Sequence, residues 1–278
     1  MGRMYGRILE DEVTKGDGRM LQTGTLILGG SYAAIGCACA AGDSILLIEH
    51  ESLGEDYSGV LRPSARCEAT DAAGKELYAF FEENGVLDAE GRLDVLRSAT
   101  TVCRFVREKG LRVLLDAPLV SLEKREDGLL ATCQTVSGLR EIHAARVLDA
   151  GFLRVSDRKA VRVMENRLHV TCLSAGEEAP RVEGGEAAAG FFPREWFVSF
   201  RFAPEVSLPE ARLSVQRRWQ AAFPSGECLI EAMSPDFDAV AVPDGGEGIC
   251  PWLPPHDTDT PIAAFERGAA WAKEVCAR

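Results

Sequence analysis

The residues from Gly29 to Glu49 have the types and spacing needed to hold the phosphates and ribose of a dinucleotide. Placed on the pattern G-x-G-x-x-G, the turn reads Gly-Gly-Ser-Tyr-Ala-Ala, with a serine where the second glycine lets the backbone approach a pyrophosphate. The acid that ends the next apolar run lies 49 − 29 = 20 positions after the first glycine, the usual separation for a ribose-binding carboxylate. The pattern predicts a dinucleotide site; the alternative is a β-α-β turn that holds no ligand. The residues expected to contact the cofactor are Gly29, Gly30, Ser31, Tyr32, Ala33, Ala34, Glu49 and His50.

A second group of reactive side chains lies near the carboxyl end, in the sequence CPWLPPHDTDTP. His256 and Asp257 precede a helix that is predicted to begin with Thr260 as its N-cap residue. If that helix start faces a cofactor, the pair can move a proton during redox chemistry. The alternative is that both residues only cap the helix and satisfy the proline-rich loop. Arg62, as a contact for an anionic substrate or phosphate, and Cys67 are weaker candidates.

The stretch LILGGSYAAIGCACAAGDSILLIEHESLGEDYSG resembles the amino-terminal segment of FAD-dependent oxidoreductases of the glutathione-reductase-like superfamily. A later stretch that ends at Gly151, VLDAG, is similar to the family's V-I-D-A-T-G segment but lacks the threonine. The resemblance implies FAD as the cofactor, with the backbone around Val120 against the adenine. It also implies that Gly151 contacts the cofactor and that Asp244, in VPDGG, takes the place of a family aspartate. Because a flavin performs the redox step itself, the expected activity is hydride transfer with a small-molecule substrate.

Two other functions stay open at this point. The serine at position 31, the missing threonine before Gly151 and the loss of the usual glycine–aspartate pairing near the carboxyl end favour a flavoprotein-like, non-catalytic subunit. Such a subunit has lost or weakened FAD binding and serves a larger complex, as a partner of another protein or as a homo-oligomer. An NAD-binding reductase without flavin is the third alternative.

The expected fold class is α/β. A Rossmann-like FAD-binding domain, with a parallel sheet and a β-meander, is interrupted by a smaller β-rich substrate domain. The expected boundaries are an amino-terminal arm over 1–23, the first part of the FAD-binding domain over 24–151, the substrate domain over 152–235 and the return to the FAD-binding domain over 236–278.

Local patterns supply the elements of these domains. Helices are predicted in AAGKELYAFFEENG and GRLDVLRSATTVCRFVREKG, and the pairs Asp127-Gly128 and Ser137-Gly138 predict two hairpins. A further hairpin is expected about Glu165-Asn166, in AVRVMENRLHVTCLSA. The residues from Ser207 to Glu210 form a capping box that opens another helix.

Composition limits the partners and the compartment. The net charge of −12 argues against nucleic acid or an anionic membrane as the main partner. The nine cysteines include no C-x-x-C pair, which favours reduced thiols in a cytoplasmic protein, and the four histidines have no metal-ligand spacing, so no metal is expected. No apolar run of the sequence is long enough to span a bilayer, and from its first residues no signal sequence is expected.

Overall fold

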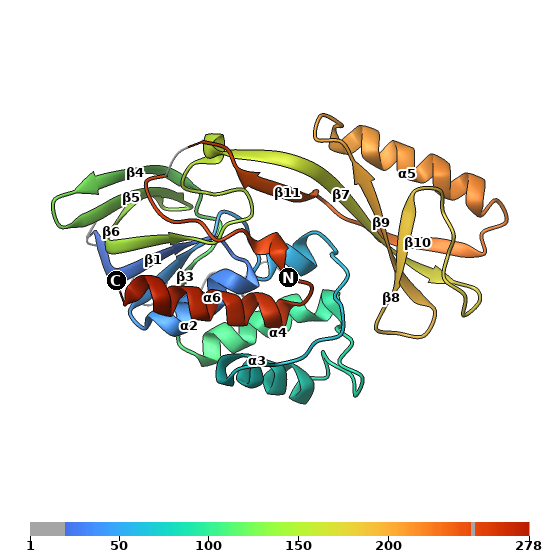
Figure 1. Ribbon diagram of the computed structural model, residues 1–278, viewed down its shortest axis with the longest axis horizontal. Coiled ribbons are helices and arrows are strands. Elements are labelled where there is room, and N and C mark those ends of the chain that lie inside the picture. The colour runs from blue at the N-terminus through green and yellow to red at the C-terminus, as the bar shows by residue number, and fades with distance from the viewer. Residues whose placement is uncertain (1–19, 246–247, 278) are drawn as a thin grey trace.

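The computed structural model describes residues 20–245 and 248–277, which form two β-sheets with helices against them (Figure 1). The first sheet has six strands in the order β3-β2-β1-β6-β5-β4. Their bounds are β1 Leu21–Leu28, β2 Ser44–Leu47, β3 Arg112–Leu114, β4 Leu119–Arg125, β5 Gly128–Thr135 and β6 Gly138–Asp149. The second sheet contains β7 Val161–Ser174, β8 Gly185–Ala189, β9 Glu195–Phe202, β10 Cys228–Met233 and β11 Asp238–Pro243. The helices are α2 Tyr32–Ala41, α3 Ala72–Glu83, α4 Val95–Glu108, α5 Leu208–Ala222 and α6 Pro261–Cys276.

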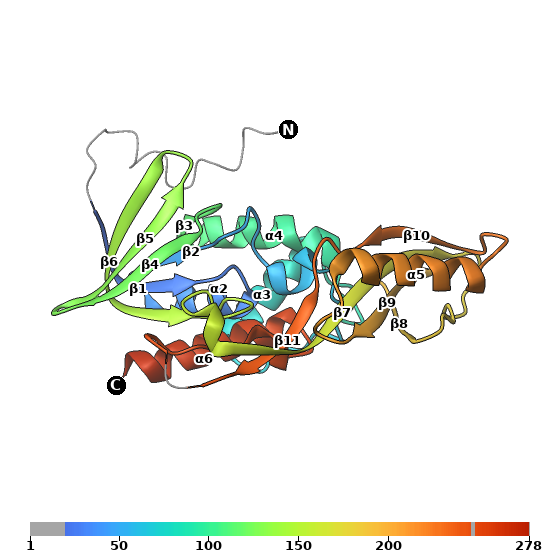
Figure 2. The same cartoon turned by 90° about the horizontal axis from the view of Figure 1, so that it is seen from above.

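The first sheet combines a parallel part with an antiparallel meander. Strands β3, β2, β1 and β6 run parallel, and β6, β5 and β4 form the meander through the two predicted hairpins. Strand β6 is long enough to serve both parts, because its first half pairs with β5 and its second half with β1. Helices α2, α3, α4 and α6 cover one face of the parallel part (Figures 1 and 2). The predicted α/β class, with a parallel sheet, a β-meander and a separate β-rich part, is confirmed.

Helices α2 and α6 pack against each other with backbone almost touching backbone. A Cβ atom added at Gly36 would lie 2.0 Å from the carbonyl oxygen of Phe265, and one added at Gly268 would lie 1.9 Å from that of Ala33. The thiol of Cys37 donates to the Gly268 carbonyl at 3.2 Å. The run of small residues in α2 is therefore required by this contact as well as by the sheet behind it.

Helices α3 and α4 lie in the two predicted stretches, although α4 begins at Val95, four residues after the start of its stretch. Asp71 caps α3 by accepting from the Gly74 amide, and Asp94 caps α4 by accepting from the Arg97 amide. Their apolar faces bury Leu77, Phe81 and Phe105 in the same core as α2 and α6. This core fixes the layer of helices that covers the parallel strands.

The second sheet is organised around one long strand. Strand β7 runs through 14 residues without a turn, so the hairpin expected about Glu165-Asn166 is wrong. The reason is that both of these residues have ladder partners, on β11 on one side and, for Asn166, on β9 on the other. Helix α5 opens with the predicted capping box and packs Val215 and Trp219 onto this sheet. The short strand β8 precedes β9 and pairs with it.

The chain returns to the first sheet later than the sequence suggested. Strand β11, expected to close the nucleotide-binding sheet, pairs with β7 in the second sheet instead. The link back is a single parallel bridge between Asp149 and Trp252, followed by α6 with Thr260 as its N-cap. Of the predicted arm, residues 1–19 lie outside the described residues, and residues 21–23 belong to β1 rather than to an arm.

Within residues 20–245 and 248–277, none of the helices has the length and apolar character needed to cross a membrane. All nine cysteines lie in these ranges, and each of them is a free thiol.

Alanine at Gly36 tests the contact between α2 and α6. Although alanine favours helix by about 1 kcal/mol over glycine, we expect Gly36→Ala to lower the free energy of unfolding by at least about 1–3 kcal/mol, because the helices must separate. Urea denaturation measures the change. The matched control is Gly176→Ala, where the nearest atom to the added Cβ is 4.0 Å away; it should stay within about 0.5 kcal/mol of wild type. Equal unfolding midpoints for Gly36→Ala and wild type would contradict the close packing.

Candidate functional site

The carboxyl ends of β1, β2 and β6 meet at one edge of the first sheet, where ligands bind in open α/β folds. Gly29, just after β1, has φ +108, and a Cβ atom there would lie 2.6 Å from the Cα of Gly151. Only glycine fits this position, because its backbone is left-handed and the turn after β6 lies against it. The two turns named by the sequence, at Gly29 and Gly151, are thus in contact.

A buried aspartate holds the turn after β6 in place. One carboxylate oxygen of Asp149 accepts from the Gly151 amide at 2.9 Å, and the other accepts from the Ser156 amide at 2.7 Å. Trp252 adds a hydrogen bond from its indole to the Gly151 carbonyl at 3.0 Å. These contacts position the turn that carries Phe152, Leu153 and Val155, which line the site.

Ser31 does not face the site. Its hydroxyl donates to the Ala150 carbonyl at 2.8 Å and accepts from the Ala34 amide at 3.1 Å, so it caps α2 and ties that helix to the end of β6. The residue is fully buried. Ser31 is among the residues expected to contact the cofactor, but its side chain points into the packed interior, where a charged group would be costly.

The next three residues of the predicted motif are also buried. Ala33 and Ala34 pack in the core of α2, and the ring of Tyr32 lies edge-on to Tyr57 and Phe81, with centroids 5.8 and 6.1 Å apart. Tyr32 can therefore offer a ligand only its backbone amide.

Two acidic side chains of the protein accept hydrogen bonds from the amides at the start of α2. The Gly30 amide donates to Oε1 of Glu55 at 2.9 Å, and the Tyr32 amide donates to Oδ1 of Asp56 at 3.0 Å. Both acids belong to a π-helical turn, Glu55–Gly59, that begins after Gly54, whose φ is +72. The first turn of a helix attracts anions through its free amides and its dipole. Here the anions are carboxylates held in the same chain.

Burial makes these carboxylates unusual acids. Desolvation raises the pKa of Asp56 to about 7, although the Tyr32 amide and the Arg62 guanidinium oppose the rise. Desolvation also raises the pKa of Glu55, against the hydrogen bond from the Gly30 amide. Within the described part of the chain, Oδ2 of Asp56 is buried without a hydrogen-bond partner. A carboxyl group in this state takes up a proton near neutral pH.

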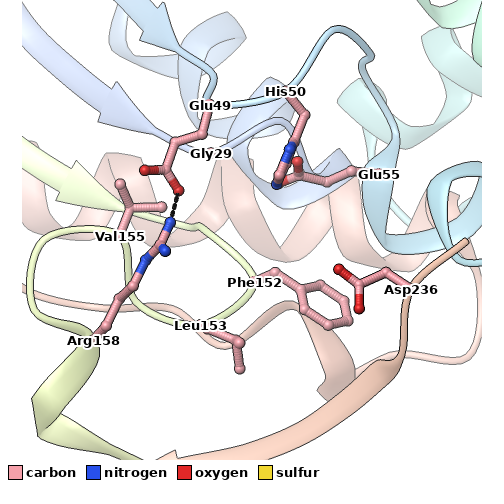
Figure 3. Close-up of a pocket in the computed structure, with 9 residues that line it drawn as sticks. All are labelled: Gly29, Glu49, His50, Glu55, Phe152, Leu153, Val155, Arg158 and Asp236. Atoms are coloured by element: carbon pink, nitrogen blue, oxygen red, sulfur yellow. Dashed lines mark hydrogen bonds and ion pairs between the residues drawn. The ribbon is translucent and has the colours of Figure 1, made fainter. Parts of the chain in front are cut away.

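A pocket of about 180 Å³ is lined by Gly29 and by Glu55, the acceptor of the Gly30 amide. Figure 3 shows its lining, which brings the end of β2 against the loop after β6: Gly29, Glu49, His50, Glu55, Phe152, Leu153, Val155, Arg158 and Asp236. Glu49 and Arg158 point at one another across the pocket and form an ion pair. The predicted ribose-binding acid, Glu49, thus lies at the pocket. Its partner there is Arg158, which comes from the segment between β6 and β7.

A larger pocket of about 520 Å³ shares five of these residues. The shared residues are Glu49, His50, Glu55, Phe152 and Asp236. The larger pocket adds the acids Glu51 and Asp116, so five acidic side chains line it. An anionic ligand meets a strongly negative surface here unless carboxyl groups are protonated or paired.

Four other predicted residues lie elsewhere or are not described. Val120, on β4, is 59% exposed and does not line either pocket; Asp244 is exposed after β11, with its amide bonded to the Ala160 carbonyl at 2.8 Å. Asp257 pairs with Arg267 at 2.9 Å. The side chain of His256 lies outside the described part of the structure, so the proposed His–Asp pair remains a prediction.

The two weaker candidates are both buried. Burial raises the pKa of the Cys67 thiol to about 11, so this cysteine is protonated at neutral pH and is a poor nucleophile. Arg62 donates to the Thr258 carbonyl at 3.0 Å and lies 3.6 Å from Asp238, in a different pocket from the one at Glu49.

The sequence reasoning missed the residues that decide the chemistry of the site. Glu55 and Asp56 lie within the stretch that resembles the flavoprotein segment but have no predicted role, and Arg158 and Phe152 belong to no predicted site. The available signal was local: two adjacent acids follow Gly54 a few residues after the strand that ends the nucleotide motif. Nothing in the spacing shows that their side chains turn back onto α2.

No family model and no curated protein matches this chain. Solved structures do match it in three dimensions. p-Nitrophenol 4-monooxygenase from Pseudomonas putida DLL-E4 is 12% identical, with a TM-score of 0.59, over 93% of this chain and 79% of that one. Anhydrotetracycline hydroxylase from Streptomyces rimosus is 12% identical, with a TM-score of 0.60, over 92% and 63%.

A third match is aklavinone-11 hydroxylase, solved with FAD and aklavinone, at 14% identity and a TM-score of 0.59 over 93% of this chain and 63% of that one. The chain thus spans less than two thirds of the length of these two hydroxylases. At such identities the likeness establishes the fold. This chain therefore shares its α/β fold with these enzymes, one of which was solved with FAD bound.

Asparagine at position 56 tests the buried carboxyl group. Because the folded-state pKa of Asp56 is raised from 3.8 to about 7, the native state holds a proton that the unfolded chain releases, and wild-type stability falls as pH rises through this window. Asp56→Asn removes that loss. We therefore expect the free energy of unfolding of Asp56→Asn, relative to that of wild type, to rise by about 2–3 kcal/mol between pH 5 and pH 8.

Chemical denaturation at the two pH values measures this growth. Asp236→Asn is the control, because Asp236 is an exposed acid at the same pocket, and its pH profile should follow wild type. A constant difference between Asp56→Asn and wild type across the window would show that Asp56 titrates as an ordinary carboxylate.

Proposed function

We propose that this protein is an FAD-binding oxidoreductase that acts on a small molecule. The observation that carries the proposal is the pair of amides at Gly30 and Tyr32, each of which already holds an acidic oxygen at the start of α2. Glu55 and Asp56 stand in for the phosphate oxygens of a dinucleotide. The donor set therefore suits a diphosphate, in a fold shared with FAD-dependent hydroxylases.

FAD fits this site once the two carboxyl groups leave it. The amides of Gly30 and Tyr32 would then hold the diphosphate, with Gly29 allowing the close approach of the backbone. Glu49 would accept hydrogen bonds from the ribose in place of its ion pair with Arg158. The flavin supplies electron transfer to or from the substrate, and the protein binds, orients and excludes water.

The substrate would bind against the second sheet. We take residues 152–235, together with β11, which pairs with β7, as the substrate part, and residues 24–151 with the return through α6 as the cofactor part. The similar structures are named for action on p-nitrophenol and anhydrotetracycline, or were solved with aklavinone, which supports a small organic substrate here. The nine free thiols favour a reducing compartment such as the cytoplasm.

A second function is favoured by the same two acids. If Glu55 and Asp56 never leave the amides, FAD cannot bind, and the chain is a non-catalytic subunit that serves a partner or a second copy of itself. The acidic lining of the larger pocket supports this alternative, because it repels a diphosphate. The two functions differ in one measurable property, the uptake of FAD.

Titration with FAD, followed by flavin fluorescence, separates the two functions. The Asp56 carboxyl, with its pKa raised to about 7, is protonated at pH 6 and ionised at pH 8. Protonation weakens its hold on the Tyr32 amide and removes repulsion of the diphosphate, so FAD should bind more tightly at pH 6. Glu55→Gln should bind FAD on the order of tenfold more tightly than wild type at pH 8, the effect of weakening one charge-assisted hydrogen bond.

Glu51→Gln is the matched control, because it removes the same charge from the neighbouring pocket without touching an amide of α2. Its FAD affinity should change less than that of Glu55→Gln. A protein that takes up no FAD at either pH, as wild type and as Glu55→Gln, is the non-catalytic subunit.

A further inference from the structure

A further pocket, of about 520 Å³, lies where the chain returns from β11 to the first sheet. Its walls are the end of β11, the turn after β6 and the segment that bridges to β6 at Trp252. Among the described lining residues, Arg154 is the one that carries a charge, and the larger apolar side chains are Ile249 and Trp252. This pocket shares no lining residue with the two pockets at Glu49 or with the pocket at Arg62.

The side chain of Arg154 is buried although it is charged. The residue is 5% exposed, and Nη2 reaches the Cys250 carbonyl only at 3.5 Å, a length at which a hydrogen bond is weak. Nε is enclosed and has no hydrogen-bond partner within residues 20–245 and 248–277. The ion pairs of these residues do not include Arg154. A buried guanidinium without a counter-charge is costly, so a ligand that supplies one is stabilised here.

The acids close to Arg154 along the chain are committed to other groups. Both carboxylate oxygens of Asp149 accept from backbone amides. Burial raises the pKa of this carboxyl, whereas a guanidinium in contact with it would lower the pKa. Asp157 accepts from a backbone amide at 3.2 Å and caps the short turn after it, and Asp244 is exposed and does not line the pocket. None of these three acids supplies the missing counter-charge.

The backbone turns Arg154 toward this pocket and away from the candidate cofactor site. Its φ is +51, in the left-handed region that residues other than glycine rarely adopt. The neighbours Leu153 and Val155 face the pocket at Glu49 instead (Figure 3). A Cβ atom added at Gly248 would lie 1.9 Å from Nη2 of Arg154, so a glycine there leaves room for the guanidinium. Strained backbone of this kind is concentrated at binding sites.

The lining suits an anion that has an apolar body. A guanidinium presents planar N–H donors that match the geometry of a carboxylate. A single cation is balanced by a monoanion, whereas a doubly charged phosphate would leave excess negative charge. Ile249, Pro251 and Trp252 supply apolar surface. The indole N–H of Trp252 is already bonded to the Gly151 carbonyl at 3.0 Å, so this ring offers a ligand its carbon surface.

We propose that this pocket binds a small organic monocarboxylate, with the carboxylate on Arg154 and the apolar part of the ligand against Trp252. The carboxylate accepts hydrogen bonds from the terminal N–H groups of the guanidinium and provides its counter-charge. Binding forms no covalent bond and transfers no electrons. The site goes beyond the proposed function and does not depend on the presence of a flavin.

The probe is benzoate, added to the full chain at neutral pH without FAD, and binding is measured by isothermal titration calorimetry. Benzamide has the same shape without the charge, and we expect it to bind at least about tenfold more weakly, because a charge-assisted hydrogen bond is lost. Acetate keeps the charge but lacks the apolar body, and inorganic phosphate carries more than one charge near neutral pH. Both should bind more weakly than benzoate.

Arg154→Met removes the charge and keeps the length of the side chain. Its affinity for benzoate should fall about 10- to 100-fold. Without benzoate its melting temperature should equal or exceed that of wild type, because an uncompensated buried charge is removed; an arginine with a purely structural role would give a lower value. The matched control is Arg201→Gln, which removes a charge paired with Glu186 in the pocket at Arg62 and should leave benzoate binding unchanged.

Gly248→Ala tests the same site with every charge retained. Its Cβ atom must displace the Arg154 guanidinium, so benzoate should bind more weakly, and this variant decides the matter if Arg154→Met does not fold.

Four results would overturn the proposal. They are no benzoate binding by wild type, equal binding of benzoate and benzamide, affinity unchanged in the Arg154 and Gly248 variants, and a loss of binding in Arg201→Gln, which would place benzoate in the pocket at Arg62. A separate FAD titration reports on the proposed function. Benzoate binding by a protein that takes up no FAD would leave this site standing, so the two failures are distinguishable.

Discussion

Helix α2 is held against α6 and against the ends of β1 and β6 at separations that only the smallest side chains allow. Gly36 and Gly268 admit the backbone of the other helix, and Gly29 admits the turn at Gly151. The Ser31 hydroxyl then joins the first turn of α2 to the carbonyl that ends β6. These contacts fix where the first amides of α2 point, and the arrangement of the site follows from that direction.

Two acidic side chains of the protein, Glu55 and Asp56, accept hydrogen bonds from those amides. A helix start offers hydrogen bonds and a partial positive charge, which offset part of the desolvation penalty of a buried carboxylate. The remainder of that penalty is visible in the raised pKa of Asp56 and Glu55. The same electrostatic feature that suits a diphosphate therefore also suits Glu55 and Asp56, and the two occupants exclude each other.

The sequence was most informative where local rules decide the structure. The strand, glycine turn, small-residue helix and second strand lie where the motif predicts them, and so do the two hairpins of the meander and the capping box of α5. The hairpin expected about Glu165-Asn166 failed because alternating polar residues suit a strand with partners on both sides as well as a turn.

The site was harder to predict than the fold. Glycine spacing located the amides of α2, but spacing along the chain cannot show that Glu55 and Asp56 fold back 25 and 24 positions to reach them. It also cannot show that Ser31 turns inward. In the pocket that contains Arg62, the side chains of His169, Ser199 and Asp238 are far apart in sequence and meet only because β7 pairs with both β9 and β11. Such convergence is a property of sheet pairing and leaves no local pattern.

Strand β7 has a mechanical consequence for the molecule. It carries β11 along its first half and β10 along its second, so one unbroken strand crosses the region where the two sheets adjoin (Figure 2). Within the described residues, β7 pairs only with strands of the second sheet, so the two sheets are joined by the segment between β6 and β7 and by the return to α6. A rotation of one sheet against the other is therefore absorbed by these connections, while the long strand and its partners move as one body.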